Sequence, residues 1–235
     1  MTAAGAGTAD LLGRLRGGLI VSCQARSGHP LHDSPVIAAL ARAAEVGGAA
    51  GLRLNGEHDI RAVRETVRLP IIGIRKVWTP DIPVYITPTF ADAQAVAAAG
   101  ADVIALDGTD RPRAGGARIG ELISRIRSEL KKPVMADVAT LEEGRRAAAL
   151  GADLVATTLS GYTGGPIPEG PDLDLVRNLA RALNVPVVAE GRYRTPEDVL
   201  EALRAGAFAV VVGRAITDAL DITRRFVEAI ARSRA

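Results

Sequence analysis

AAGADVIALD, residues 98–107, passes from the end of a helical stretch through a glycine into an apolar run with strand character. Glycine suits this junction because it reaches the positive φ of a helix C-cap without steric cost. The same order of features recurs three more times, at residues 47–56, 149–158 and 204–213. This repeated helix-to-strand unit is the first indication of the fold class.

Four further apolar runs complete the set of strands. Proline stands at the entrance of three of them, at residues 69–76, 132–138 and 185–192, where it costs no ladder hydrogen bond. The fourth run, GLIVSCQA at residues 18–25, comes first in the chain. The sequence therefore predicts eight strands.

Stretches with helical periodicity follow each predicted strand. They cover residues 34–46, 57–67, 89–100, 116–130, 140–150, 172–183, 195–206 and 215–233. Thr195, Pro196 and Glu197 are the residues expected at a helix start, namely an N-cap, a proline at the first helical position and an early negative charge. Strands and helices thus alternate along the whole chain.

Eight such alternations in 235 residues are typical of a (β/α)8 barrel, an α/β fold in which one parallel sheet closes on itself. We expect a single domain over residues 10–235, preceded by a flexible tail at residues 1–9. A doubly wound open sheet is the alternative. It is disfavoured because the first strand runs into SCQARSG (22–28), which lacks the G-x-G-x-x-G pattern of dinucleotide-binding folds.

The composition narrows the class of protein. Hydrophobic residues make up 48% of the chain but aromatic residues only 3%, an aliphatic bias that suits a parallel sheet covered by helices. The 29 basic and 27 acidic residues are interleaved, so the sequence has no footprint for nucleic acid or a membrane surface. One cysteine, no apolar run of membrane-spanning length and no signal-peptide pattern predict a cytoplasmic protein.

Polar side chains gather where the predicted strands end, which is the active face of a (β/α)8 barrel. These strand ends supply Gln24, Arg53, Lys76, Asp137, Thr158 and Glu190. Any one of them could be an ordinary solvent-facing group, but their convergence predicts a catalytic or binding site. Arg75 and Lys76 are neighbours on an extended segment, so one of the two points away from the site.

A glycine and an arginine occur together after each of the last two strands, as Gly191-Arg192 and Gly213-Arg214. The loops at these positions of a barrel often bind phosphate through backbone N–H groups and a helix N-terminus. Glycine lets the phosphate approach the backbone, and arginine adds a bidentate positive charge. The sequence therefore predicts a small phosphorylated substrate.

The histidines and the cysteine are given no catalytic role. His29, His32 and His58 match no metal-ligand spacing and are interpreted as solvated side chains, so no metal site is expected. Cys23 lies between two polar residues of the first strand and is expected to pack as a small hydrophobic side chain.

Nine short motifs follow one another along the chain. They are SCQA (22–25), GLRLNG (51–56), PIIGIRK (70–76), VYITPT (84–89), ALDGTDRPR (105–113), MADVAT (135–140), TTLSGYT (157–163), AEGRYRTPED (189–198) and VVVGRAIT (210–217). In these motifs, and over essentially its whole length, the chain resembles the N-acetylmannosamine-6-phosphate 2-epimerase family. Members of that family interconvert N-acetylmannosamine 6-phosphate and N-acetylglucosamine 6-phosphate in the breakdown of amino sugars and sialic acid.

The resemblance implies roles for the strand-end residues. Lys76 would move the proton at C2 of the sugar, with Glu190 as its carboxylate partner. The expected substrate-binding residues are Gln24, Arg53, Asp137 and Thr158. No metal or organic cofactor is expected, and a homodimer formed through the last helix is the expected assembly.

Some alternatives stay open. After Thr217 the family usually has Arg-Pro, whereas this chain has Asp218-Ala219, so Arg214 is a candidate to supply the missing positive charge. A ribulose-phosphate epimerase, a Schiff-base aldolase that uses Lys76, and a non-catalytic phosphosugar-binding barrel are the alternative functions.

Overall fold

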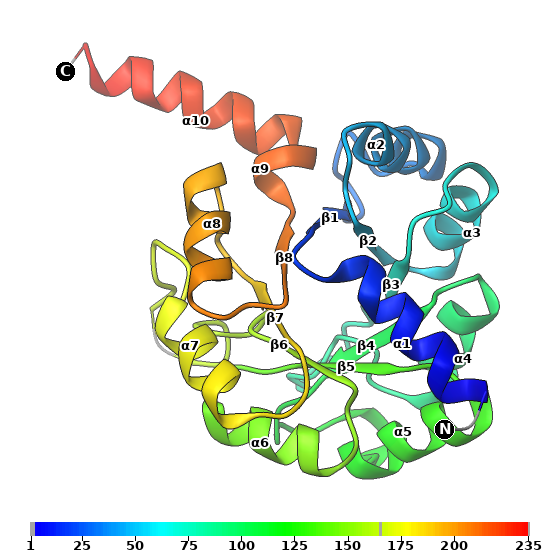
Figure 1. Ribbon diagram of the computed structural model, residues 1–235. Helices are drawn as coiled ribbons and strands as arrows, with labels where there is room; N and C mark the ends of the chain where they lie inside the picture. Colours follow the sequence, from blue (N-terminus) through cyan, green and yellow to red (C-terminus); the bar gives the residue numbers. More distant parts are fainter. Residues whose placement is uncertain (1–2, 165, 235) are drawn as a thin grey trace.

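The computed structural model describes residues 3–164 and 166–234. Within this part, eight parallel strands close into one barrel in chain order, with β8 paired to β1 (Figure 1). The strands are β1 Leu19–Cys23, β2 Gly51–Asn55, β3 Ile71–Ile74, β4 Val103–Asp107, β5 Val134–Asp137, β6 Leu154–Ala156, β7 Val187–Glu190 and β8 Ala209–Val212. Each strand falls inside one of the eight predicted runs. The predicted (β/α)8 barrel is confirmed.

Helices α2 to α8 surround the barrel (Figure 1). The helices are α1 Ala3–Leu15, α2 Ser34–Val46, α3 Glu57–Thr66, α4 Phe90–Ala98, α5 Ile119–Arg125 with a π-helical turn Ile126–Leu130, α6 Leu141–Ala149, α7 Leu173–Ala182, α8 Pro196–Arg204, α9 Arg214–Thr217 and α10 Ala219–Arg232. The predicted helix start at Thr195 is confirmed, because its hydroxyl accepts the backbone N–H of Asp198 in a capping box. Among the described helices, none is both long and apolar enough to cross a bilayer.

The core has two layers. One cluster of buried side chains, which includes Ile20, Ile72 and Met135, fills the inside of the barrel. Other clusters, which include Leu52 and Leu54, lie between the strands and the helices. The strands are thus apolar on both faces over most of their length, as expected for a parallel sheet buried on both sides.

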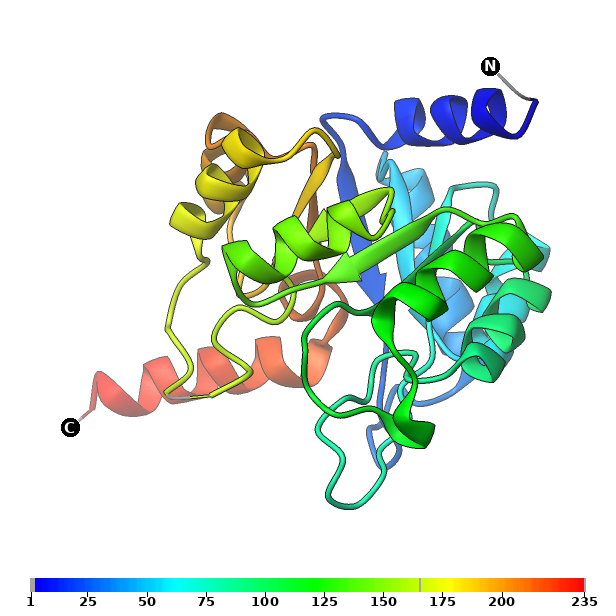
Figure 2. The same cartoon turned by 90° about the horizontal axis from the view of Figure 1, so that it is seen from below.

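The flexibility of the tail predicted over residues 1–9 stays a prediction, although the structure describes part of this tail as helical. Residues 3–9 belong to α1, which lies across the end of the barrel where the strands begin (Figure 2). Leu15 is fully buried and packs into the interior cluster, and Leu11 and Leu12 pack against it. These three leucines of α1 cover a barrel end that would otherwise meet water. Residues 1 and 2 lie outside the described residues.

The last predicted helix, residues 215–233, is divided at Asp218. This residue has non-helical backbone angles, φ −103° and ψ 83°, and its carboxylate accepts the backbone N–H of Asp221 at 3.0 Å. Asp218 therefore acts as the N-cap of α10 and ends α9. After this break α10 leaves the ring of helices and projects from the barrel (Figures 1 and 2).

Candidate active site

The alternation of side chains along each strand brings the predicted site residues together. On β2, Leu52 and Leu54 pack outward, so Arg53 between them points into the barrel. The same period of two gives an inward-facing carboxylate at the end of β5, Asp137, and at the end of β7, Glu190. Because all eight strands run in one direction, these inward residues meet at the same end of the barrel.

The structure resolves the choice between Arg75 and Lys76. Ile74 belongs to the interior cluster, and Lys76, two residues further, lies on the same side and lines a cavity. The Arg75 guanidinium points away and lies 3.4 Å from the Glu57 carboxylate and 3.5 Å from the Asp92 carboxylate. Of the two neighbours, only Lys76 can act on a ligand in the cavity.

Arg53 is the centre of a buried ionic network and is only 1% exposed. Its two terminal nitrogens donate to the two carboxylate oxygens of Asp137, at 2.5 and 3.0 Å, and one of them also donates to Glu190 Oε2 at 2.6 Å. The Thr158 hydroxyl lies 2.7 Å from Asp137 Oδ1 and 3.1 Å from Glu190 Oε2, and it can donate to either. One guanidinium from β2 therefore holds the acids of β5 and β7 in a fixed arrangement.

The surroundings shift the pKa of both groups expected to move protons. Burial, followed by the positive charge of Arg53, lowers the pKa of Lys76 to about 8, although Glu190 and Asp137 act in the opposite direction. Burial raises the pKa of the Glu190 carboxyl, and the Arg53 charge opposes that rise. Each group is moved toward neutral pH, as is common for residues that exchange protons with a substrate.

The cavity above this network has a volume of about 720 Å³. Lys76, Glu190, Gln24 and Thr158 line it. Gln24 Nε2 donates to Ser22 Oγ at 2.8 Å, while Gln24 Oε1 is buried and has no hydrogen-bond partner among the described residues. That oxygen is therefore available to accept a hydrogen bond from a bound ligand.

Two of the predicted substrate-binding residues lie behind the cavity. Arg53 and Asp137 are 1% and 0% exposed, and neither belongs to the cavity lining. Thr158, which contacts both of them, and Glu190, which accepts from Arg53, do line the cavity. The expectation that Arg53 and Asp137 bind the substrate therefore stays a prediction, while their contacts with Thr158 and Glu190 are shown.

The loops after β7 and β8 lie at the same cavity. The four predicted phosphate-binding residues all line it: Gly191, Arg192, Gly213 and Arg214. The guanidinium of Arg192, however, donates to the backbone carbonyls of Gly170 and Ser160, so it fastens the loop between β6 and α7. Arg214 has an exposed side chain, which leaves its charge open to a ligand.

Several lining residues were not predicted from the sequence, among them His29, Trp78 and Tyr85. His29 was interpreted as solvated, and that is wrong. Its Nδ1 accepts the backbone N–H of Leu31 at 3.1 Å, so Nε2 carries the proton that is donated to Asp218 Oδ1 at 3.2 Å. This bond ties the loop after β1 to the start of α10, across 189 residues of sequence, and no local motif signals it.

The remaining sequence interpretations concern the cysteine and metal ligands. Cys23 is fully buried in the layer between strands and helices, and burial raises the pKa of its thiol to about 12. The prediction that it packs as a small hydrophobic side chain is confirmed. Within residues 3–164 and 166–234, no three His, Cys, Asp or Glu side chains are grouped so that they could hold a metal ion.

A family model, two relatives and a solved structure that match this chain all carry the name of one enzyme. The family model described as "NanE: Putative N-acetylmannosamine-6-phosphate epimerase" matches residues 37–232. A relative from Caldanaerobacter subterraneus subsp. tengcongensis, named "Putative N-acetylmannosamine-6-phosphate 2-epimerase", is 49% identical and covers 96% of each chain. A relative of the same name from Cutibacterium acnes is 46% identical over 95% of this chain and 98% of its own. The solved structure of the N-acetylmannosamine-6-phosphate 2-epimerase from Clostridium perfringens has a TM-score of 0.90 and 42% identity, over 93% of this chain and 95% of that one.

Proposed function

The chain belongs to the NanE family of N-acetylmannosamine-6-phosphate epimerases, and from this premise we propose that it interconverts N-acetylmannosamine 6-phosphate and N-acetylglucosamine 6-phosphate. It is accordingly an isomerase. The observation that supports its chemistry is the presence, in one cavity, of Lys76 with a lowered pKa and Glu190 with a raised pKa. A pair of this kind can take and give a proton near neutral pH.

Inversion at C2 requires a proton to leave from one face and to return on the other. The C2 proton is acidic only beside a carbonyl, so the sugar ring opens to the aldehyde first. Lys76, as the neutral amine, removes the proton and leaves a planar enolate, and protonation of the opposite face gives the epimer. With a pKa of about 8, about a tenth of the Lys76 amines are neutral at pH 7. The reaction is neither an oxidation nor a reduction, so it balances without a redox cofactor.

The other lining residues have proposed roles that follow from their contacts. Glu190 is the carboxylate partner of Lys76. Gln24, through its unpaired Oε1, and Thr158, through its hydroxyl, bind sugar hydroxyls. Arg53 and Asp137, the other residues expected to bind the sugar, act through Thr158 and Glu190 by fixing their orientation.

The substrate phosphate is proposed to bind between the loops after β7 and β8. Gly191 has φ 118°, a conformation that glycine adopts without strain, and its lack of a side chain lets a phosphate approach the backbone. Arg214 supplies positive charge, since Arg192 is already bound to two carbonyls. Asp218, which stands where the family usually has arginine, binds His29 instead.

We propose the cytoplasm as the location and the breakdown of amino sugars, including those from sialic acid, as the metabolic setting. A single cysteine, Cys23, leaves no internal disulfide to form, as in a reducing compartment. The expected partner is a phosphorylated amino sugar.

A homodimer through α10 is the proposed assembly. On this projecting helix Phe226, Val227 and Ile230 are 70%, 60% and 52% exposed. Large apolar side chains grouped on one projecting helix usually mark an interface. Phe226→Glu together with Ile230→Glu is expected to convert the dimer to a monomer in sedimentation velocity. An unchanged sedimentation coefficient in this variant, or a monomeric wild-type protein, would contradict the assembly.

The decisive test of the function is turnover in D₂O. Either hexosamine 6-phosphate, incubated with the protein, should yield both epimers, and ¹H NMR should show loss of the C2 proton signal as deuterium enters. Epimerisation without deuterium at C2 would exclude proton exchange with solvent. Borohydride addition during turnover should trap no covalent adduct, whereas an adduct on Lys76 would favour the aldolase alternative.

A further inference from the structure

The segment after β3 presents two stacked aromatic rings beside Lys76. It returns on itself as a hairpin, with bridges between Lys76 and Ile86 and between Thr79 and Ile82. The rings of Trp78 and Tyr85, one from each arm, are 5.6 Å apart and inclined by only 9°. In a chain with 3% aromatic residues and a single tryptophan, this pair is an unusual concentration of aromatic surface.

Hydrogen bonds hold the backbone of the hairpin that carries the two rings. Val77 N–H donates to the carbonyl of Tyr85 at 2.8 Å, and Thr87 N–H donates to the carbonyl of Arg75 at 2.7 Å. At its base, the backbone N–H of Lys76 donates to the side chain of Asn55 at 2.8 Å. The same backbone that positions the Lys76 amine therefore positions the aromatic pair.

Trp78 is not part of the hydrophobic core. Its side chain is 65% exposed, although it lines the cavity together with Tyr85 and Lys76. Trp78 follows Lys76 by two residues on an extended segment, so the two side chains emerge on the same side about 7 Å apart. Tyr85 lies deeper than Trp78. Burial raises the pKa of the Tyr85 hydroxyl, and the nearby negative charge of Asp137 raises it further. The pair thus forms an aromatic wall that runs from the cavity rim toward the proton-transfer residues.

We propose that this wall, Trp78 and Tyr85, binds the 2-acetamido group of the substrate and so selects N-acylated hexosamine 6-phosphates over plain hexose 6-phosphates. The inference rests on the proposed function, in which Lys76 acts at C2. The acetamido group is attached to that same carbon, while the phosphate lies toward the loops after β7 and β8. A planar amide with a methyl group packs well on an aromatic face, and a hydroxyl in its place has no such surface to offer.

Because Trp78 is the only tryptophan, its fluorescence reports directly on contact with a ligand. N-acetylglucosamine 6-phosphate should change the emission in a saturable manner, at concentrations close to its KM. Glucose 6-phosphate, which lacks the acetamido group, should leave the emission almost unchanged at concentrations where it competes for the site. Equal changes with both sugars, or no change with either, would overturn the proposal.

Substitution gives the second readout. Trp78→Ala should raise KM for N-acetylglucosamine 6-phosphate roughly three- to tenfold, since an aromatic contact is worth up to about one factor of ten. The value of kcat should stay close to that of the wild type, because binding alone is lost. Trp78→Phe, which keeps an aromatic face, should restore most of the affinity. The matched control is Val46→Ala, an exposed apolar residue (73%) at the end of α2, which should leave KM unchanged.

The outcomes separate this inference from the proposed function. If the wild-type protein turns over neither hexosamine phosphate, the function fails, whatever the fluorescence does. If turnover is normal but Trp78→Ala leaves KM unchanged, the aromatic wall fails and the function stands. An emission that depends on protein concentration and not on ligand would assign Trp78 to a contact between copies of the chain, and would also overturn the proposal.

Discussion

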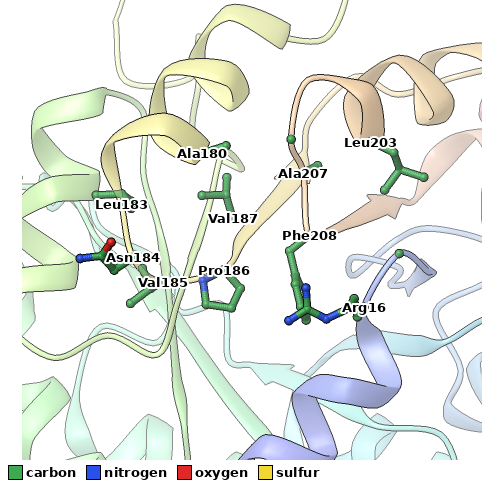
Figure 3. A pocket seen from close by; sticks show the side chains of 12 residues that line it. Arg16, Ala180, Leu183, Asn184, Val185, Pro186, Val187, Leu203, Ala207 and Phe208 are labelled. Carbon is green, nitrogen blue, oxygen red and sulfur yellow. The ribbon is translucent and has the colours of Figure 1, made fainter.

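The two ends of the barrel each carry a cavity, but the two cavities are lined by different kinds of side chain. The cavity where the strands end, of about 720 Å³, is lined by Lys76 and Glu190 above the buried Arg53. The cavity near the strand starts, of about 520 Å³, is lined by the entries of β7 and β8 and the ends of α7 and α8 (Figure 3). Its one charged lining residue, Arg16, lies over the Phe208 ring at 4.9 Å from the centroid.

The difference between the two ends follows from the cost of burying charge. Ionic side chains can be held in a protein interior only when they are paired and hydrogen-bonded. At the strand ends, Arg53 meets both Asp137 and Glu190, and the cost is offset by five short polar contacts around them. At the strand starts no acid faces Arg16 among the lining residues, and an apolar helix, α1, closes the barrel. Cavity volume therefore does not distinguish the two ends of the barrel, whereas paired buried charges do.

The largest effect should come from removing the amine at the strand ends. Lys76→Ala should lower kcat by a factor of roughly 10²–10⁴, the usual contribution of a proton-transfer group. Its affinity for N-acetylglucosamine 6-phosphate, measured by calorimetry, should stay near the wild-type value because Gln24 and the phosphate loops are intact. Full activity in this variant would remove Lys76 from the mechanism.

The matched control lies at the other end of the barrel. Arg16→Ala removes a positive charge that also lines a cavity, but one without acids. It should leave kcat and KM at their wild-type values and change the free energy of unfolding by less than about 1 kcal/mol. A loss of turnover here would break the distinction between the two ends.

A mutation at the strand starts should affect stability instead of turnover. Leu15 is fully buried where α1 closes the barrel. Leu15→Ala should lower the free energy of unfolding by about 2–5 kcal/mol, the usual cost of such a cavity. Urea denaturation followed by circular dichroism measures this cost. The kcat of the folded protein should be unchanged, and a large fall in kcat at full folding would show that the two ends are coupled.

The smallest expected effect is a shift of a pH profile. Lys76 acts as a base only when it is neutral, so kcat/KM should rise roughly tenfold per pH unit and level off near its pKa of about 8. Glu190 favours the charged ammonium and raises the pKa of Lys76. Glu190→Gln removes that negative charge, so the rising limb should move to lower pH while the maximum rate falls. Profiles of both proteins on the same substrate test this, and a shift to higher pH would contradict the electrostatic arrangement.

The sequence could predict the eight strands because each combines an apolar run with a glycine or proline at its entrance. It could not choose between Arg75 and Lys76, because strands apolar on both faces carry no signal of which face is inside. The bond between His29 and Asp218 was also beyond it, since 189 residues of sequence separate the two partners. The sequence also does not show that Leu15 packs into the barrel end, because the side chains it contacts there come from strands distant in the chain.

The sequence by itself determined the barrel, the family and the candidate residues at the strand ends, because periodicity and local capping are properties of neighbouring residues. Only the tertiary structure decided that Arg53 and Asp137 stand behind the cavity, that Arg192 fastens a loop, and that an aromatic pair flanks Lys76. These three arrangements depend on which side chains meet across the closed barrel. Burial and pairing across strands, which no short stretch of sequence contains, then set the pKa values on which the chemistry depends.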